Sequence, residues 1–294
     1  MDHRNLIARG APSLIIAALA FAMSSPLALM AEPLDPIAVS AIRMWIGSLC
    51  LFALSPRATI CSMARLSLRH RLQLLGVGAI LAAHQAGYLL GLSKTSLPAA
   101  VCLVSVEPVA VVLVARMAFR SRLRPLEVLG LLAAVLGSIL VAGGGGAENH
   151  AVGNMLVIVA VVLYGVYIAA ARHLRNLMPV IPYAACVFGA SALLLTPFAV
   201  ARLGNWADVP PNSWWAVFAL GTIPTLIGHT LIQRSAREMP AAAIALVSPG
   251  ETIGSLAIGA WLLHTWPTAR MAFGGSIIIA GVLTTGIAVS RRKD

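Results

Sequence analysis

The sequence predicts an all-α polytopic membrane protein in which ten transmembrane helices form two inverted five-helix repeats. Three observations lead to this prediction. Of the 294 residues, 59% are hydrophobic and only 11% are charged, whereas about 25% of the residues of a soluble globular domain are charged. The apolar residues fall into runs of about 20, the length that a helix needs to cross a bilayer. A glutamate and two glycines also recur at one spacing, 144 residues, in the two halves of the chain.

Ten apolar runs define the expected spans. Only helices and closed barrels cross a bilayer, since every backbone group there must be hydrogen-bonded inside the protein. A barrel would show segments of about 10 residues with alternating polarity, and the longer continuous runs of this chain indicate helices instead. The expected spans are residues 12–31, 37–54, 72–92, 98–117, 126–144, 152–171, 182–201, 214–232, 241–261 and 271–290.

The first and eighth spans have special features. The first follows Arg4 and Arg9, as the apolar part of a signal peptide would. Because nine further spans follow, we expect it to remain as an uncleaved membrane helix. Pro26 and Pro224 lie inside the first and eighth spans, where each is expected to produce a kink.

The distribution of basic residues sets the expected orientation. With ten crossings and a cytoplasmic N-terminus, 17 of the 21 lysines and arginines lie on the cytoplasmic side. Lys94, Arg202 and Arg270 lie on the other side, and Arg43 lies inside a span. Short cytoplasmic loops of membrane proteins carry such an excess, so we expect both termini in the cytoplasm. The same bias explains the net charge of +11, and we expect no nucleic acid as a partner.

Residues 1–146 and 147–294 are predicted to be two copies of one five-helix repeat. Because five is an odd number, the second copy enters the membrane upside down, and equivalent loops should differ in charge. Residues 116–124 carry four arginines, whereas their counterpart 260–268 carries none. Such inverted repeats are typical of secondary transporters, which bind substrate near the midplane between the halves. The residues that match after a shift of 144 are Glu107 and Glu251, Gly130 and Gly274, and Gly137 and Gly281.

Two acidic residues, Glu107 and Glu251, lie near the middle of predicted spans. Intramembrane acids are costly and face a partner or a water-filled cavity. Each is a candidate to contact a substrate amine or to carry a proton, and a structural ion pair with Arg43 is the alternative. Arg43 lies in the same half as Glu107 and at a similar depth, so we expect these two to pair, with Glu251, which is also near the midplane, as a competing partner. Glu251 is then the candidate for proton coupling.

Helix-breaking residues adjoin both acids. Pro108 follows Glu107, and Pro249 and Gly250 precede Glu251. Proline removes a backbone donor, and the carbonyl groups freed in this way line polar cavities in transporters with interrupted helices. We predict a helix break at both places, with a simple packing kink as the alternative.

Other polar residues inside the spans are candidates for substrate contacts. A substrate carboxylate is the alternative partner for Arg43. His84 and Tyr88 are four residues apart and therefore share one face of the third span, and Tyr164 lies in the sixth. Hydrogen-bonded packing is the competing interpretation of these last three. His229 lies near the cytoplasmic end of its predicted span, so it is a candidate for the membrane interface.

Motifs in both halves resemble one family of carriers. The pattern is similar to the drug/metabolite transporter superfamily, specifically its ten-helix EamA-type carriers. The resemblance implies a secondary carrier of the bacterial inner membrane, usually an exporter of amino acids or other small metabolites, which needs no bound cofactor and no ATP. It also implies a large aromatic residue at the position of Tyr164. The motifs are SAIRMWIGSLCLFAL (40–54), VEPVAVVLVARMAFRSRLRPLEVLGLLAAVLGSILVAGG (106–144), LYGVYIAAARHL (163–174) and ETIGSLAIGAWLLHTWPTARMAFGGSIIIAGVLTTG (251–286).

Two other classes of protein remain as alternatives to a transporter. A membrane-embedded enzyme would need a Ser/His, paired-Asp or HExxH constellation, and the chain has none. A non-transporting scaffold would lack polar midplane residues in both halves. No metal site is expected, because the four cysteines form no CxxC motif or Cys/His cluster, and the chain has no phosphate-binding GxxxxGK[ST] motif. The expected partners are a small-molecule substrate and the lipid bilayer, with a homodimer as a candidate assembly.

Overall fold

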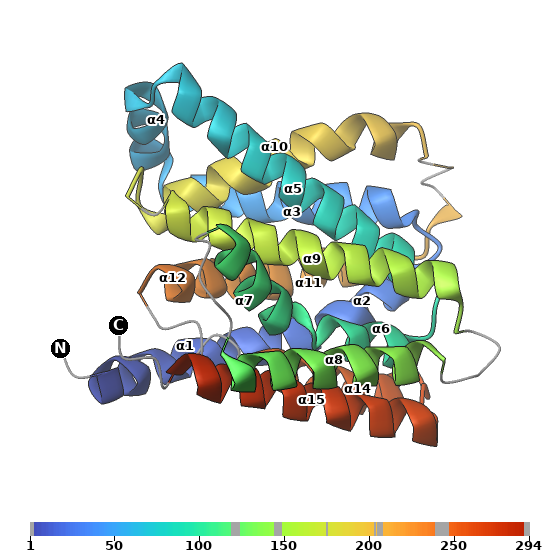
Figure 1. The fold of residues 1–294 in the computed structure, drawn as a ribbon. Coiled ribbons are helices and arrows are strands. Elements are labelled where there is room, and N and C mark those ends of the chain that lie inside the picture. Colours follow the sequence, from blue (N-terminus) through green and yellow to red (C-terminus); the bar gives the residue numbers. More distant parts are fainter. Residues whose placement is uncertain are drawn as a thin grey trace.

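The computed structural model describes residues 3–118, 124–143, 149–174, 176–202, 204, 208–238 and 247–290. Within this part of the chain every regular element is a helix, and the longer helices run together as one bundle (Figure 1). The predicted all-α fold is therefore confirmed. The helices are α1 (His3–Ala22), α2 (Ser24–Met30), α3 (Pro36–Leu54), α4 (Pro56–Arg65), α5 (Leu68–Leu92), α6 (Leu97–Val104), α7 (Glu107–Ala118), α8 (Pro125–Ala142), α9 (Ala151–His173), α10 (Val180–Val200), α11 (Pro211–Leu220), the π-helix η2 (Gly221–His229), α12 (Thr230–Glu238), α14 (Val247–Leu262) and α15 (Ala269–Ser290).

Nine helical segments among the described residues are long and apolar enough to cross a bilayer. They correspond to nine of the ten predicted spans. The remaining span, 241–261, is represented by α14, and residues 239–246 before it lie outside the described part of the chain. The eighth segment, Pro211–Arg237, is longer than the predicted 214–232. The chain is thus a multi-pass membrane protein.

Capping residues fix where several spans begin. Asp35 precedes α3, and its Oδ1 accepts hydrogen bonds from the backbone nitrogens of Ile37 at 2.8 Å and Ala38 at 3.4 Å. Ser67 and Ser96 accept similar backbone hydrogen bonds at the starts of α5 and α6. The first backbone donors of a helix have no partner within it, and short polar side chains satisfy them. These local bonds set the starting residues of three spans.

Three spans are interrupted. α1 and α2 meet at Met23, and α6 and α7 meet at a turn formed by Ser105 and Val106. The eighth span has π-helical geometry over Gly221–His229, which contains Pro224. Proline removes a backbone donor from the regular helical pattern, and π-helical turns often occur where that pattern is disturbed. The kink expected at Pro224 is therefore present as a local change of helix type.

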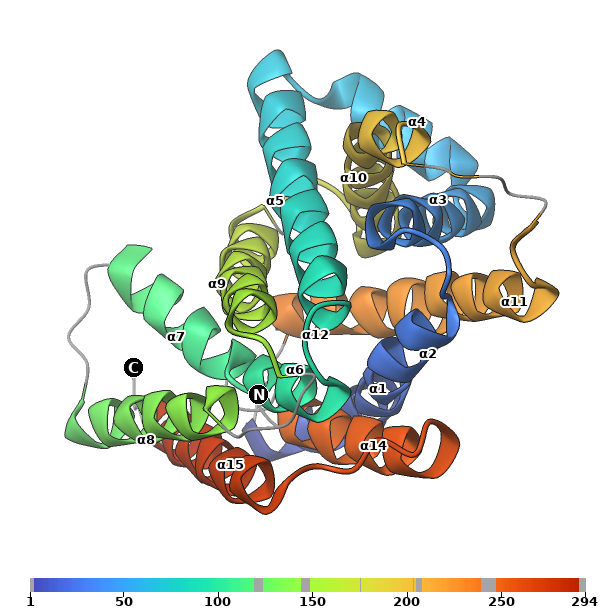
Figure 2. The same cartoon turned by 90° about the vertical axis from the view of Figure 1, so that its right-hand side faces the viewer.

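The helices pack as two halves related by an approximate two-fold axis. α3 packs against α10, and α8 against α15 (Figure 2), and these are the helices that the repeat makes equivalent. The contact of α5 with α9 is matched by that of α1 with η2 and α12. Likewise, α7 on α9 is matched by α14 on α1. For each of these contacts, the equivalent helices of the other repeat also make contact. This pattern confirms the predicted two-repeat architecture. The predicted boundary at 146 and 147 lies outside the described residues.

The repeated glycines form the seam between α8 and α15. A Cβ atom at Gly130 would lie 2.6 Å from the carbonyl oxygen of Gly281, and one at Gly137 would lie 2.6 Å from that of Gly274. Gly130 therefore faces Gly281, which is the counterpart of Gly137, and Gly137 faces Gly274, which is the counterpart of Gly130. Small residues allow membrane helices to approach closely, so close packing explains why these glycines recur 144 residues apart.

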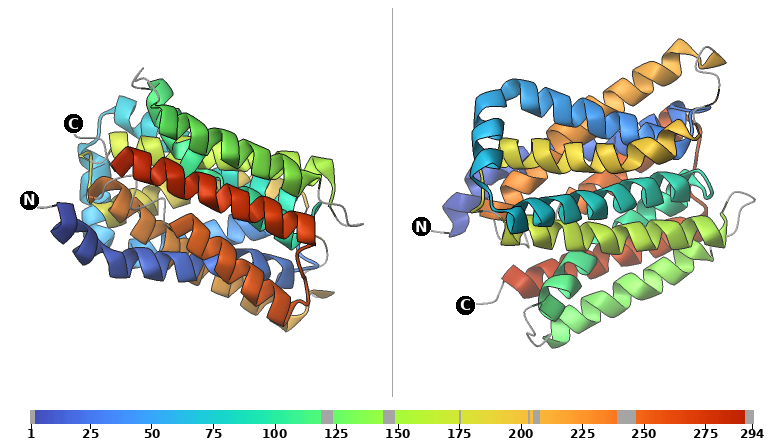
Figure 3. Two further views of the ribbon diagram at one scale, coloured as in Figure 1. Left: turned by 60° about the horizontal axis from the view of Figure 1, so that its bottom comes forward. Right: turned by 90° about the horizontal axis from the view of Figure 1, so that it is seen from above.

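Both ends of the described chain lie at one end of the bundle, which we call the terminal face. α1 begins and α15 ends there, as Figures 1 and 3 show. The short helix α4, with Arg57 and Arg65, also lies at this end. The other end of the bundle, where α2 and α5 finish, is called the opposite face.

Candidate functional site

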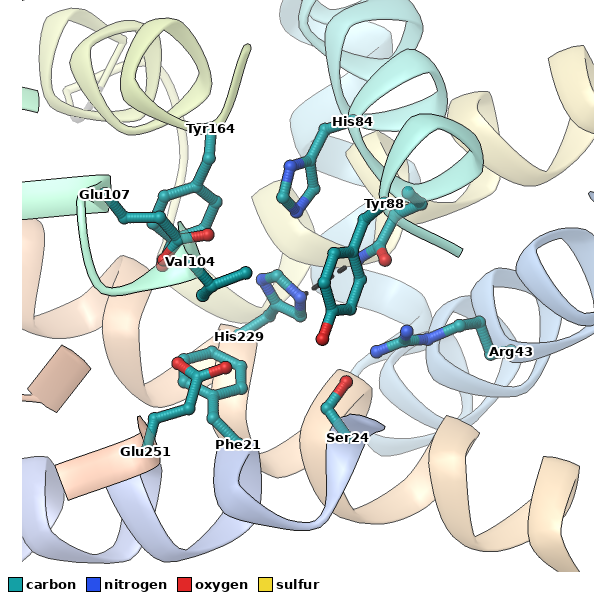
Figure 4. Close-up of a pocket in the computed structure, with 11 residues that line it drawn as sticks. Phe21, Ser24, Arg43, His84, Tyr88, Val104, Glu107, Tyr164, His229 and Glu251 are labelled. Carbon is teal, nitrogen blue, oxygen red and sulfur yellow. Dashed lines mark hydrogen bonds between the residues drawn. The ribbon is translucent and has the colours of Figure 1, made fainter. Parts of the chain in front are cut away.

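A buried cavity lies between the two halves, near the middle of the spans (Figure 4). Its cavity volume is about 30 Å³, within a wider unfilled space of about 340 Å³ that includes space open to solvent. Both repeats contribute side chains to its wall, as expected of a site on the axis that relates them. The lining residues are Phe21, Ser24, Arg43, His84, Gln85, Tyr88, Val104, Glu107, Tyr164, His229 and Glu251.

All the residues that the sequence predicts as substrate contacts line this cavity. They are separated by up to 208 positions in the sequence and come from α3, α5 and α7 of the first repeat and from α9 and α14 of the second. Whether they bind a substrate stays a prediction. These residues are Arg43, His84, Tyr88, Glu107, Tyr164 and Glu251.

Arg43 supplies the positive charge of the cavity. Its side chain is 1% exposed, and its Nε donates a hydrogen bond to Thr225 Oγ1 at 2.8 Å. This bond holds the guanidinium against η2, while Nη1 has no hydrogen-bond partner. In Figure 4 the guanidinium points toward the interior of the cavity. Arg43 therefore has an unused donor in a site where unpaired polar groups are costly.

The ion pair expected between Arg43 and Glu107 is not formed. Figure 4 places Glu107 and Arg43 on opposite sides of the cavity. The acid that interacts electrostatically with Arg43 is Glu251, without direct contact. The expectation is wrong because depth along the membrane normal does not fix the direction in which a side chain leaves its helix.

The two acids interact with each other across the repeat. Glu107 is the first residue of α7 and is half-buried, whereas Glu251 lies in the first turns of α14 and is 8% exposed. The side chains are close enough to interact electrostatically. Among the described residues, neither carboxylate has a hydrogen-bond or ion-pair partner. The cavity thus holds two carboxylates and one guanidinium whose charges are not compensated by direct contacts.

Gln85 and His229 are joined by a hydrogen bond between their Nε2 atoms at 3.0 Å. They are 144 residues apart, so each is the repeat counterpart of the other, and their contact marks the approximate two-fold axis. The interpretation of His229 as a candidate for the interface is wrong, since its side chain is 4% exposed. The reason is that the helix continues to Glu238, which places His229 deeper than the predicted end of the span implied.

Aromatic rings surround this axis. His84 Nδ1 lies 2.8 Å from the carbonyl oxygen of Ala160, which fixes the ring on α5 against α9. The ring centroids of His84 and Tyr164 are 5.2 Å apart, and those of Phe21 and His229 are 5.0 Å apart. Aromatic pairs at such distances stabilise defined ring orientations. The same aromatic rings therefore pack against each other and line the cavity.

The predicted helix-break residues are arranged differently in the two repeats. Pro108 is the second residue of α7, directly after the turn between α6 and α7. Pro249 and Gly250 lie in the first turn of α14, where a missing backbone donor leaves no helical bond unmade. At the interrupted end of α6, Ser248 Oγ donates to the carbonyl oxygen of Val104 at 3.5 Å. The second repeat therefore helps to satisfy a carbonyl group beside the break in the first.

Five lining residues are not among the predicted substrate contacts: Phe21, Ser24, Gln85, Val104 and His229. Phe21 and Val104 are apolar residues in apolar spans, so no sequence signal distinguishes them. Gln85 and His229 carry a usable signal, since polar residues occur at equivalent positions in both repeats and such residues usually face the protein interior.

Comparison with known proteins agrees with this architecture. Residues 8–143 and 151–287 each match the model of the EamA-like transporter family. A relative from Streptantibioticus cattleyicolor, named "Probable terminal-alkyne amino-acid exporter", is 25% identical over 185 residues. That match covers 62% of this chain and 61% of the relative, less than two thirds of the relative's length. A solved structure titled "Crystal structure of protein" has a TM-score of 0.69 and 20% identity, with 99% of this chain and 100% of the other covered. At that identity the likeness concerns the fold alone.

The two family matches cover almost the whole chain and fall on the two halves that the packing relates. They agree with the helical bundle, the membrane-spanning segments and the cavity between the repeats. The chain therefore belongs to the EamA-like transporter family of multi-pass membrane proteins.

Proposed function

We propose that the protein is a secondary active transporter that exports amino acids or other small organic metabolites by alternating access. One observation carries the proposal: Arg43 Nη1 and the carboxylates of Glu107 and Glu251 line one cavity without direct partners. Uncompensated charges in such a site are costly, so a ligand with complementary charges would stabilise it. A zwitterion supplies a carboxylate for Arg43 and an ammonium group for the two glutamates.

The paired acids also provide a route to proton coupling. Two carboxylates that interact in a poorly solvated site are stable together only if one carries a proton or a cation lies beside them. Substrate ammonium and proton would therefore compete for the same pair. Inward movement of protons would then drive outward movement of substrate. We assign the proton to Glu251, which is the more buried of the two acids.

The proposed location is the bacterial inner membrane, with both termini in the cytoplasm. The terminal face would then be cytoplasmic, because it carries the basic helix α4 and the arginines at the start of α5. An excess of arginine on the cytoplasmic side is the usual determinant of orientation. The name of the relative, which describes an amino-acid exporter, supports the substrate class and the direction of transport.

Transport by purified protein in liposomes tests the proposal. Radiolabelled amino acids would be compared with the corresponding amines, which lack the carboxylate that Arg43 would bind. Loss of a charge-assisted hydrogen bond corresponds to a change of about ten- to a hundredfold, so Arg43→Gln should reduce amino-acid transport by that factor. Glu107→Gln and Glu251→Gln remove the two acids of the cavity one at a time. Glu127→Gln is their matched control, because Glu127 is fully buried in α8 but outside the cavity, and glutamine also serves at this capping position.

The outcome separates the three classes of function. Concentrative transport that depends on Arg43 and survives Glu127→Gln supports the carrier. A folded protein that moves none of the tested metabolites but modifies a lipid would be an enzyme. Folded protein without transport, binding or chemistry would be a scaffold, and either of these last results would overturn the proposal.

A further inference from the structure

Two buried side-chain hydrogen bonds flank the cavity on opposite sides. The hydroxyl groups of Ser25 and Tyr88 bond to each other and join α2 to α5. Gln233 Nε2 donates to the hydroxyl group of Tyr167 and joins α12 to α9. All four side chains are at most 6% exposed. Each bond therefore connects two helices that would have to separate if water entered between them.

The Ser25–Tyr88 bond lies at the edge of the cavity, and the Tyr167–Gln233 bond lies about one helical turn beyond its lining. Tyr88 is four residues after His84 on α5, and Ser25 follows the lining residue Ser24. These positions lie toward the opposite face, where α2 and α5 end. On the other side, Gln233 is four residues after His229, and Tyr167 is three residues after the lining residue 164. These positions lie toward the terminal face, where α9 and α12 end (Figure 1).

The two bonds join equivalent pairs of helices in the two repeats, although not at equivalent residues. A shift of 144 moves Ser25 to position 169, two residues from Tyr167, and moves Tyr88 to position 232, next to Gln233. In each repeat, the first and third spans are therefore joined by a polar contact at a similar depth. The two contacts lie on opposite sides of the cavity. Inverted repeats produce two access states when the halves exchange conformations. In the proposed cycle, each of these open states would have one of the two bonds broken and the other formed.

We infer that Ser25–Tyr88 and Tyr167–Gln233 are the two gates of the transport cycle and that they open alternately. The inference rests on the proposed transport function. Ser25–Tyr88 closes the path to the opposite face, and Tyr167–Gln233 closes the path to the terminal face. Both bonds are formed in this structure, one on each side of the cavity. Tyr88 is also part of the cavity wall, so a bound substrate would touch the Ser25–Tyr88 gate directly.

Accessibility of a cysteine in the cavity tests the gates without knowledge of the substrate. The probe is Val104→Cys in a chain whose four native cysteines are replaced by alanine, labelled with a membrane-impermeant maleimide. Right-side-out and inside-out vesicles report the two faces separately. A hydrogen bond of ordinary strength shifts an opening equilibrium by about two- to tenfold. Tyr88→Phe should raise labelling from the opposite face by this factor, and Tyr167→Phe should raise it from the terminal face.

Tyr183→Phe is the matched control, because the Tyr183 hydroxyl group is buried but has no hydrogen-bond partner. It should leave labelling unchanged from both sides. Ser25→Ala and Gln233→Leu break the same bonds from their other ends and replace any tyrosine variant that fails to fold. Labelling that is unchanged in both gate variants, or that rises from the same face in both, would overturn the inference. Because labelling needs no substrate, this result is independent of whether amino acids are transported.

Discussion

The hydrogen bond between Gln85 and His229 joins two residues that are 144 positions apart, the period of the repeat. Two residues that are equivalent in the repeat and touch each other lie on the axis that relates the halves. Gln85 Nε2 lies 3.0 Å from His229 Nε2, while the buried Nδ1 of His229 has no hydrogen-bond partner among the described residues. In the alternating-access cycle that we propose, an exchange of conformations between the halves would map this contact onto itself and keep it in both access states.

Breaking this axial contact should lower stability without favouring either face. Gln85→Leu leaves a buried ring nitrogen of His229 without a partner, which costs about 1–3 kcal/mol. Thermal unfolding in detergent should show a lower Tm, whereas labelling of Val104→Cys should change equally from the two sides. The double variant Gln85→Leu, His229→Phe should recover part of the lost stability, since no unpaired group then remains. A strong bias toward one face in the single variant would contradict the axial role.

The glycine seam predicts a position-specific effect on stability. Gly137→Ala places a Cβ atom 2.6 Å from the carbonyl oxygen of Gly274, and relieving this overlap requires α8 and α15 to move apart. Overpacking of this kind costs about 1–3 kcal/mol, so the Tm and the folded yield should both fall. The control is Gly76→Ala on α5, where nothing lies within 4 Å of the added atom. Equal effects of the two substitutions would contradict close packing at the seam.

The orientation of the chain is open to a direct measurement. Cys61 is exposed on α4 at the terminal face, and Ser93, exposed after α5, lies at the opposite face. With a cytoplasmic terminal face, impermeant maleimide should label Cys61 only in inside-out vesicles. Ser93→Cys, in a chain with Cys61→Ala, should be labelled only in intact cells. If Cys61 and Ser93→Cys were labelled from the same side, an odd number of membrane crossings between the two positions would be contradicted. If each were labelled from the side opposite to that expected, the proposed orientation would be contradicted.

The charged part of the cavity is predictable from the sequence because charge is rare inside apolar spans. Arg43, Glu107 and Glu251 stand out in their runs, and an intramembrane charge has to face the protein interior. The repeat could likewise be read from Glu107 and Glu251 with the paired glycines. The seam between α8 and α15 then explains why glycine is needed at these positions, because the two helices approach closely there.

The remaining features depend on tertiary packing that no single span determines. Which acid lies nearer to Arg43 depends on the rotation of each helix about its own axis, and that rotation is set by its neighbours. The depth of His229 follows from a helix that continues past the apolar run to Glu238. Phe21 and Val104 line the cavity only because α1 and α6 end beside it. The local sequence predicts the apolar length of a span, but it does not determine the rotation of the helix or which residues of other helices it contacts.

Glu251→Gln should separate substrate binding from proton coupling. Glutamine keeps the size of the side chain and its ability to accept a hydrogen bond from an ammonium group, but it does not take up and release a proton. If Glu251 carries the proton, a pH gradient should no longer drive transport in liposomes. Exchange of external for internal substrate should persist, because exchange needs no net movement of protons.

Glu107→Gln leaves Glu251 titratable and should weaken substrate affinity while transport still responds to the gradient. Glu127→Gln should behave as the parent. An unchanged response to the pH gradient in Glu251→Gln would remove this residue from the coupling mechanism, and loss of exchange together with gradient-driven transport would assign it to substrate binding instead.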